Sequence, residues 1–316
     1  MTAKSFAVLI VGYQRVESVR AILEKCLLAK VDNVLISIDY PRDESIEAVA
    51  INMTLRDLVV EFKSKFAYFH TRFLDKNVGC SANVLSACDW AFGQYDAVAV
   101  LEDDCQPSLG FFDYCRDSEK LLETNNEILL ACGTQFVPKE QTNSVAYLSK
   151  YALTWGWFTR AVQWQSIRTL LVNESHQRSL SIWSLDYEAI YWNEGGRRAY
   201  QGYVDVWDTA LVAVINRGTY FALLPATNLI SNVGNDSVAT HTGNDKLWTH
   251  ALQEGYECGG FENITLNPQA DAWLRENFYQ IKFRHLITTR ITRILDFFKK
   301  SKFGSLIDRW QSLSAK

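Results

Sequence analysis

The 316-residue sequence has no run of about 20 apolar residues, which is the length that a helix needs to cross a bilayer. It has no basic surplus either, since 32 lysines and arginines stand against 36 aspartates and glutamates and give a formal net charge of −4. Domains that bind nucleic acid usually carry excess positive charge, so this balance argues against such a partner. Internal repeats and low-complexity linkers are absent as well, which favours one domain with an elaborated second half.

No Cys-x-x-Cys pair occurs among the seven cysteines. An odd, scattered set of cysteines is typical of a reducing compartment and does not suit a disulfide framework or a zinc site. The short apolar run at residues 6–11 is not followed by a small-residue cleavage pattern, so it predicts a first strand and not a signal peptide. The expected location is therefore cytoplasmic.

What the sequence does contain is an alternation of apolar strands and amphipathic helices. This alternation predicts an α/β fold with a mostly parallel, Rossmann-like sheet flanked by helices, and a hydrophobic content of 48% is ample for its core. The expected strands cover residues 6–12, 34–39, 66–69, 97–101, 128–132 and 220–224. The expected helices cover residues 15–30, 44–63, 81–92, 108–123, 161–171, 182–192 and 204–216.

One strand ends abruptly in three consecutive carboxylates, the triplet Glu102–Asp104. Its uninterrupted apolar run predicts burial on both faces of a parallel sheet, and such sheets carry ligand sites at the carboxyl ends of their strands. Three adjacent carboxylates repel one another unless a cation offsets their charge, and oxygen ligands suit Mg²⁺ or Mn²⁺. The alternative is a solvated acidic turn.

Three further turns are expected on the same rim of the sheet, and together they predict a nucleotide pocket. Asp39 can accept hydrogen bonds from a base or ribose, Tyr13 can stack on a base, and Arg15 or Lys76 can face phosphates. Each signal alone is weak, because an aspartate after a strand is often a helix cap and Asn-x-Gly is often an ordinary turn. The candidate contacts outside the acidic triplet are Gly12, Tyr13, Arg15, Asp39, Lys76 and Asn77.

In this order the motifs resemble those of GT-A glycosyltransferases, most closely the group around eukaryotic N-acetylglucosaminyltransferase I together with bacterial surface-polysaccharide transferases. The matching segments span roughly residues 6 to 245. They are residues 8–15, the Glu102–Asp104 triplet in place of the family's Asp-x-Asp metal motif, Trp155-Gly156-Trp157, Val206-Trp207-Asp208, and residues 228–234 and 239–242.

The resemblance implies an inverting transferase that moves a sugar from a nucleoside diphosphate sugar, commonly a UDP-sugar, to a glycan or lipid-linked acceptor in bacterial surface polysaccharide synthesis, such as that of lipopolysaccharide or capsule. Asp104 would then bind the metal cofactor, Mn²⁺ or Mg²⁺, while Glu102 and Asp103 face the nucleoside and Asp39 reads the base. Residues 1–275 would form the GT-A domain, with a nucleotide-binding half over about 1–132 and an acceptor-binding half over about 133–275.

Asp208 falls at the position of the family's general base. The eukaryotic enzyme has two consecutive acids after its tryptophan, whereas a threonine follows Asp208 here, so Asp205 is the alternative base. Asp208 can equally be a carboxylate at a helix N-terminus with a purely electrostatic role. His241 is a candidate metal or phosphate ligand, and Trp155 and Trp157 are candidates for an acceptor platform or for core residues.

Two other functions share some of these sequence features. A sugar-1-phosphate nucleotidyltransferase has similar strands and metal-binding acids, but it needs a glycine-rich basic loop after the first strand, which the segment Gly12–Arg15 lacks. A non-catalytic carbohydrate-binding module would account for an aromatic content of 13%, but not for a buried strand that ends in acids.

The last 41 residues, 276–316, are predicted to form a basic amphipathic helical tail. Apolar residues recur there at helical spacing, among them Phe283, Ile287 and Ile291, while arginines and lysines fall on other faces. Such a helix can dock on the core of its own domain, or it can lie in an anionic membrane interface through residues 281–310. The second possibility would place the protein peripherally at the inner membrane.

Overall fold

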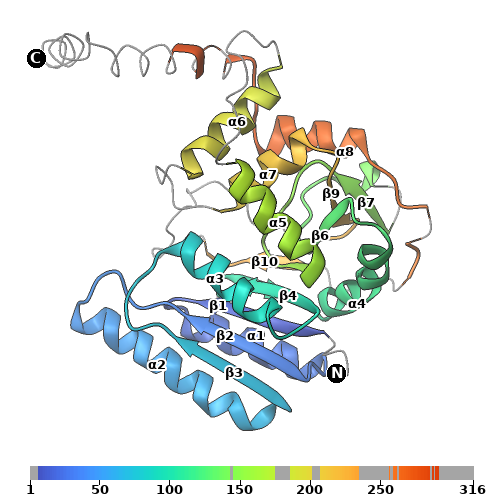
Figure 1. Cartoon of the computed structure of the whole chain (residues 1–316). Helices are drawn as coiled ribbons and strands as arrows, with labels where there is room; N and C mark the ends of the chain where they lie inside the picture. Colours follow the sequence, from blue (N-terminus) through green and yellow to red (C-terminus); the bar gives the residue numbers. More distant parts are fainter. Residues whose placement is uncertain are drawn as a thin grey trace, which may run out of the picture.

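The computed structural model describes residues 6–142, 145–174, 186–200, 207–234, 256, 259–261, 263–284, 287 and 289–291. An eight-stranded sheet passes through the molecule in the order β3-β2-β1-β4-β8-β6-β9-β7 (Figure 1). Its strands are β1 Ala7–Gly12, β2 Asn33–Ile38, β3 Tyr68–Phe73, β4 Ala97–Glu102, β6 Ile128–Cys132, β7 Ala146–Ser149, β8 Trp157–Arg160 and β9 Phe221–Pro225.

Six of the eight strands run in one direction. The strands β3, β2, β1 and β4 are mutually parallel, and β6 and β9 point the same way because antiparallel β8 lies between β4 and β6. Only β7 and β8 run in the opposite direction. The predicted α/β fold with a mostly parallel sheet is therefore confirmed, and the sheet is continuous through both predicted halves of the chain.

Helices cover both faces of the sheet and enclose two apolar cores. Side chains alternate along β1, so that Leu9 joins the core under α3, α5 and α7, while Val8 and Ile10 join the core under α1, α2 and α4. Every residue of β1 is buried, as expected for a strand covered on both sides. The helices are α1 Val16–Leu28, α2 Ile46–Phe62, α3 Cys80–Phe92, α4 Leu109–Thr124, α5 Ala161–Glu174, α6 Tyr187–Tyr200, α7 Asp208–Arg217 and α8 Pro268–Trp273.

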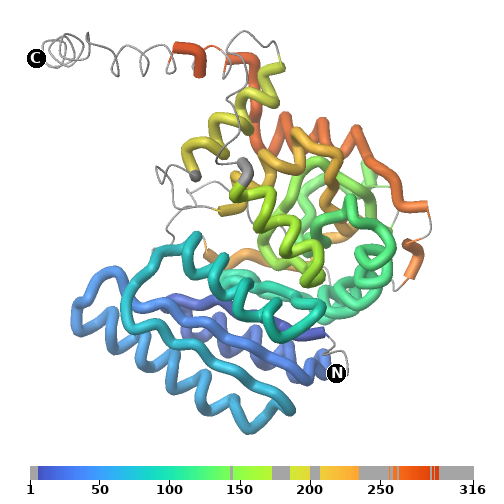
Figure 2. Tube along the Cα trace, in the orientation of Figure 1, coloured from blue at the N-terminus to red at the C-terminus, as the bar shows by residue number. Residues whose placement is uncertain are grey.

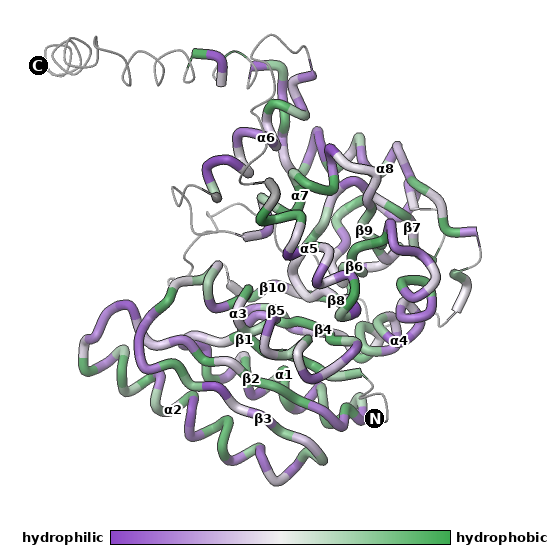
Figure 3. Tube along the Cα trace, in the orientation of Figure 1, coloured by the Kyte–Doolittle hydropathy of each residue, from purple (hydrophilic) through white to green (hydrophobic). Residues whose placement is uncertain are grey.

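The strands β1 to β4 lie on one side of the molecule and β6 to β9 on the other, and the two groups meet where β4 pairs with β8 (Figure 2). Hydrophobic residues concentrate along central strands such as β4 and β6 (Figure 3). Among the helices of the described ranges, none combines the length and the apolarity that crossing a bilayer requires.

Several predicted boundaries differ from the structure. The third strand extends to Phe73, and α3 begins one residue earlier than expected, with Gly79 at its N-cap. Gly79 has a φ of 86°, a left-handed conformation that favours glycine. The helix expected at 182–192 begins at Tyr187 and runs on to Tyr200. Residues 182–185 and 204–206 of the expected helices lie outside the described residues, as does the tail beyond Ile291.

A small two-stranded ribbon was not predicted. It pairs β5, Cys105–Pro107, with β10, Ile230–Asn232, in antiparallel register. Since β5 follows the acidic triplet directly, the ribbon brings residues 230–234 beside these acids.

Helix α8 is attached to the end of β7 through Asp271. Its Oδ1 accepts a hydrogen bond from Ser149 Oγ at 2.5 Å, and its Oδ2 accepts one from the backbone N–H of Lys150 at 3.0 Å. Burial raises the pKa of Asp271 from 3.8 to about 6, although these two hydrogen bonds oppose the shift. A carboxyl group whose pKa is raised by folding stabilises the protein most at low pH, and this contribution disappears as the pH rises through 6.

We therefore predict that an Asp271→Asn variant gains stability relative to the wild type as the pH rises. Between about pH 5 and pH 7.5 the difference in the free energy of unfolding should shift by about 1 kcal/mol in favour of the variant, because asparagine does not titrate. Urea denaturation at the two pH values measures this difference. The exposed-site variant Asp57→Asn is the control and should show no such shift. A difference for Asp271→Asn that stays constant with pH would contradict the prediction.

Candidate functional site

The predicted ligand-contact turns lie on one rim because three adjacent parallel strands end there. Val11 lies opposite Glu102 in the pairing of β1 with β4, and Gly12 lies opposite Ile38 in the pairing of β1 with β2. The residues that follow these strands are consequently brought together at the carboxyl edge of the sheet, where ligand sites occur in α/β folds.

Asp103 fixes the loop between β1 and α1. Its Oδ2 accepts hydrogen bonds from the backbone N–H of Tyr13 at 2.7 Å and of Gln14 at 3.3 Å. Its Oδ1 accepts one from Arg15 Nη1 at 2.9 Å, and its backbone carbonyl accepts one from the Ser18 hydroxyl. Because Asp103 is 5% exposed and its carboxylate is used in this way, it orders the loop and offers little surface to the nucleoside that the resemblance assigned to it.

Asp39 fixes a second loop, between β3 and α3. Its Oδ1 accepts hydrogen bonds from the backbone N–H of Tyr40 at 2.8 Å and of Val78 at 3.1 Å. Its Oδ2 accepts from the N–H of Gly79 at 3.2 Å and from Asn77 Nδ2 at 3.1 Å. Burial raises the pKa of Asp39, while the backbone hydrogen bonds lower it. The predicted site residues Asp39 and Asn77 are thus direct partners.

Asn52 connects these two parts of the rim and was missed by the sequence analysis. This side chain of α2 is 1% exposed, and its Nδ2 donates to the carbonyl oxygens of Tyr13 at 3.0 Å and Asp39 at 2.8 Å. A single polar residue inside a helical pattern gives no signal of such a role. Only the tertiary structure places it between the two loops.

The other predicted contacts of the nucleotide half differ in their surroundings. Lys76 is exposed, whereas the Tyr13 hydroxyl accepts a hydrogen bond from the backbone N–H of Arg42 at 2.8 Å. A Cβ atom at Gly12 would lie 2.7 Å from Ile38 Cδ1. Glycine is therefore needed there for the close approach of β1 to the end of β2.

Negative charge accumulates at the end of β4. Burial raises the pKa of Glu102 well above its ordinary value, and the charges of Asp104, Asp208 and Asp103 raise it further, while Arg15 opposes them. Burial and the charge of Asp103 likewise raise the pKa of Asp104. Arg15 Nη1 lies 3.9 Å from Asp104 Oδ2, farther than from Asp103. A bound cation would relieve this repulsion.

The segment after β10 lies against Asp104. The backbone N–H of Val233 donates to the carbonyl oxygen of Asp104 at 2.8 Å, and the Asn232 side chain is hydrogen-bonded to the Asp104 carboxylate. Gly234 N–H donates to Asn232 Oδ1 at 2.7 Å, and a Cβ atom at Gly234 would collide with Asp104 Oδ2. A side chain at position 234 would therefore displace the Asp104 carboxylate.

Asp208 is the first residue of α7 and lies close enough to the acidic triplet to interact with it. Its Oδ1 accepts a hydrogen bond from the N–H of Thr209 at 2.7 Å, as expected for a carboxylate in a first helical turn. Its charge raises the pKa of Glu102, and it also raises that of Tyr279 after the larger effect of burial. Asp208 therefore lies at the N-terminus of α7 and within electrostatic range of the acidic triplet.

The two tryptophans of the Trp-Gly-Trp motif have different surroundings. Trp157 is 1% exposed, and its ring lies 5.9 Å from that of Trp164 and 5.4 Å from that of Trp207, so it is a core side chain. Trp155 is partly exposed and contacts Phe136 edge-on at 5.5 Å. Of these two tryptophans, only Trp155 is therefore exposed enough to contact an acceptor.

The glycine between these tryptophans holds the motif against the ribbon. Gly156 has a φ of 66°, and a Cβ atom there would lie 2.5 Å from Ile230 Cδ1. Its carbonyl oxygen accepts a hydrogen bond from the N–H of Gly133 at 2.7 Å. The motif therefore packs directly under β10.

The carboxylates of this site suit a metal ion that is also coordinated by a bound ligand. Within the described ranges no group of three or more His, Cys, Asp and Glu side chains could hold a metal ion by itself. Mg²⁺ in particular is commonly bound by one or two carboxylates together with substrate phosphates, and the Asp104 side chain is 24% exposed. Two predicted residues, Asp205 and His241, lie outside the described residues.

No protein-family model and no curated protein matches the sequence. Among solved structures, the chain is similar to a protein from Bacillus anthracis described as a glucose-1-phosphate thymidylyltransferase, in complex with sucrose. That pair shares 11% identity and a TM-score of 0.40 over 77% of this chain and 98% of the other. It is also similar to a UDP-glucose pyrophosphorylase complexed with UDP-glucose, with 10% identity and a TM-score of 0.38 over 71% and 90% of the two chains. Similarity at this level says nothing about the reaction.

We predict that Gly234→Ala displaces the Asp104 carboxylate and weakens the binding of Mn²⁺ in the presence of UDP by about tenfold. Because Gly234 is buried, urea denaturation checks that the variant remains folded. Titration followed by electron paramagnetic resonance measures the free Mn²⁺. Gly93→Ala, at the end of α3 and away from the acids, is the matched control. Equal Mn²⁺ affinity in both variants would contradict the assignment.

Proposed function

We propose that the protein is an inverting, metal-dependent glycosyltransferase. Its proposed donor is a nucleoside diphosphate sugar, specifically a UDP-sugar. One observation carries the proposal. Glu102 and Asp208 are separated by more than a hundred residues of sequence, but the start of α7 lies near the end of β4. Trp207 contacts Trp157 at 5.4 Å between ring centroids, and Trp157 lies opposite Val100 of β4. In keeping with this proximity, the charge of Asp208 raises the pKa of Glu102. Sugar transfer requires both kinds of carboxylate, one for a metal and one for a proton.

The proposed division of labour follows the surroundings of each residue. Asp104 holds Mn²⁺ or Mg²⁺, which when bound neutralises the diphosphate leaving group. Asp208 accepts the proton of the acceptor hydroxyl as the oxocarbenium-like carbon is attacked, and a single base opposite the leaving group gives inversion. Asp39 and Asp103 keep the flanking loops in place for the nucleotide. Trp155 contributes a partly exposed aromatic surface for the acceptor.

A sugar-1-phosphate nucleotidyltransferase remains the alternative, and the loop after β1 argues against it. That reaction binds a nucleoside triphosphate, for which a glycine-rich basic loop is expected. Here the loop contains one glycine, Gly12, which is used in packing, and its Arg15 is paired with Asp103. Formation of a nucleotide sugar and pyrophosphate from a nucleoside triphosphate and a sugar 1-phosphate would overturn the transferase proposal.

Two isosteric variants separate the proposed roles. Asp104→Asn should abolish Mn²⁺-dependent UDP binding, because an amide is a weaker ligand for a hard cation than a carboxylate. Asp208→Asn should retain UDP affinity but lower Mn²⁺-dependent hydrolysis or transfer of the nucleotide sugar by about 10²- to 10⁴-fold. Isothermal titration with UDP and a screen of nucleotide sugars measure the two effects.

Asp57→Asn, an exposed carboxylate on α2, serves as the control in both assays. Full activity of a folded Asp104→Asn protein would refute the metal role. Loss of UDP binding in Asp208→Asn would assign that residue to binding and not to proton transfer.

We also propose that residues 281–310 bind an anionic membrane surface, where a lipid-linked acceptor would be met. The apolar side chains Phe283, Ile287 and Ile291 are 58%, 49% and 53% exposed, and their spacing of four residues places them on one helical face. Lysines and arginines of the same segment complement anionic lipids.

Sedimentation with vesicles of phosphatidylcholine and phosphatidylglycerol tests this membrane contact. The double variant Phe283→Ser/Ile287→Ser should bind at least about tenfold more weakly, since burial of each large apolar side chain contributes about 1.5–3 kcal/mol. The control is Leu28→Ser/Val162→Ser, two side chains that are 66% and 60% exposed elsewhere. Equal binding of both double variants would refute the membrane contact.

A further inference from the structure

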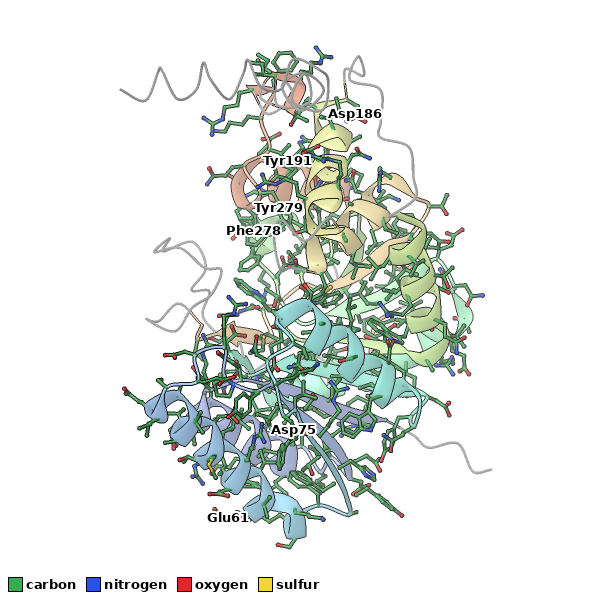
Figure 4. All side chains as sticks on the ribbon, turned by 60° about the vertical axis from the view of Figure 1, so that its left-hand side comes forward. Glu61, Asp75, Asp186, Tyr191, Phe278 and Tyr279 are labelled. Atoms are coloured by element: carbon green, nitrogen blue, oxygen red, sulfur yellow. The ribbon has the colours of Figure 1, made fainter. Side chains whose placement is uncertain are left out.

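A polar cavity of about 320 Å³ lies between α6, α7 and α8, away from the acidic triplet. Its principal lining residues are Lys150, Tyr151, Glu188, Asn216, Asp271 and Arg275. Asp186, which also lines it, stands at the start of α6 in Figure 4. The volume falls in the usual range of small-molecule sites, about 300–1,000 Å³.

This cavity is separate from the proposed reaction centre. Because β7 is antiparallel to β9, and β9 points the same way as β4, the end of β7 at Ser149 lies at the sheet edge opposite Glu102. Helix α7 leads to the same conclusion. Asp208 begins it and Asn216 lies eight residues later, which corresponds to about 12 Å along the helix axis.

Glu188 is the centre of the cavity's hydrogen-bond network. Its Oε1 accepts from the Tyr151 hydroxyl and, at 2.9 Å, from Asn216 Nδ2. Its Oε2 lies 3.5 Å from Arg275 Nη1. The Lys150 ammonium donates to two backbone carbonyls, those of Gly218 at 2.8 Å and Tyr220 at 3.0 Å. These contacts fix polar groups of α6, of α7 and of the segments that follow β7 and α8 before any ligand arrives.

Arg275 offers donors to the cavity. Its Nη1 and Nη2 contact Glu188 and Glu276, and its side chain is 27% exposed. A guanidinium carries five N–H donors, so its terminal nitrogens can also donate to an acceptor on a ligand.

The residues that line the cavity indicate which kind of ligand it would bind. Three carboxylates, Asp186, Glu188 and Asp271, outnumber the cations Lys150 and Arg275, which disfavours a phosphate or another anion. A hydroxyl group both accepts and donates, and it can therefore bridge a guanidinium and a carboxylate. In addition, Leu266 and Pro268 offer apolar surface to the C–H face of a sugar ring.

We infer that this cavity binds a neutral sugar unit at a distance from the reaction centre. Under the proposed function, that unit belongs to a remote part of the glycan acceptor or product, and this link alone rests on the proposed function. The binding of sugar itself does not depend on nucleotide or metal.

Saturation-transfer NMR with glucose, N-acetylglucosamine and their β-1,4-linked disaccharides, at about 10 mM and without nucleotide or metal, tests the inference at an expected Kd of about 1 mM. Leu266→Trp, which fills the cavity, should abolish the signal. Leu109→Trp is the matched control, because these leucines are 37% and 38% exposed. Arg275→Lys keeps the charge but removes the planar guanidinium with its several donors, and it should weaken binding about fivefold.

Absence of binding by all four sugars overturns the inference, as does binding that is unchanged in both Leu266→Trp and Arg275→Lys. A parallel titration with UDP and Mn²⁺ reports on the acidic site. If that titration fails while sugar binding responds to the two variants, the sugar cavity stands and the proposed transferase does not. If UDP binds and sugar binding is absent, the proposed transferase stands and the sugar cavity does not.

Discussion

The rim of the sheet depends on one interaction, the acceptance of three hydrogen bonds from the β1–α1 loop by the Asp103 carboxylate. A carboxylate at the end of a buried strand is costly unless its oxygens are satisfied, and the loop supplies the donors. The same constraint operates at Asp39, where four donors surround the carboxylate. Hydrogen bonds to these two buried acids thus fix the β1–α1 and β3–α3 loops, and Asn52 links the backbone of Tyr13 to that of Asp39.

This organisation explains how residues of one acidic triplet come to differ in role. Asp103 points back into the protein and is nearly inaccessible, whereas the Asp104 side chain is partly exposed and lies beside the segment 232–234. Asp103 and Asp104 lie in the turn between β4 and β5, where the chain changes direction, so these adjacent acids need not share one environment. The proposed metal ligand is consequently distinguished from its neighbour by local backbone geometry and not by residue type.

Much of the fold could be predicted from the sequence because its signals are local. The apolar runs of β1, β4 and β6 and the helical spacing in α1, α2 and α4 determine these elements almost independently of their surroundings. Non-local features were missed for the same reason. The ribbon of β5 with β10 joins residues 125 positions apart, its strands are three residues long, and no periodicity can be read from so few residues. Asn52 and the cavity beside α6 likewise exist only through tertiary contacts. The rim residues could be located from the sequence, but not the burial that assigns Asp103 and Trp157 to structural roles.

The antiparallel insertion of β8 between β4 and β6 also has a consequence for folding. The strands β3, β2, β1 and β4 are formed by the first 102 residues and pair with one another, so this part of the sheet can assemble from contacts of moderate sequence separation before β4 pairs with β8. The outer edge of β4 then remains without a partner until residues 157–160 have been synthesised. During translation, a strand that is apolar except for Glu102 is therefore left at an open sheet edge for more than fifty residues, and an unpaired edge of this kind favours aggregation.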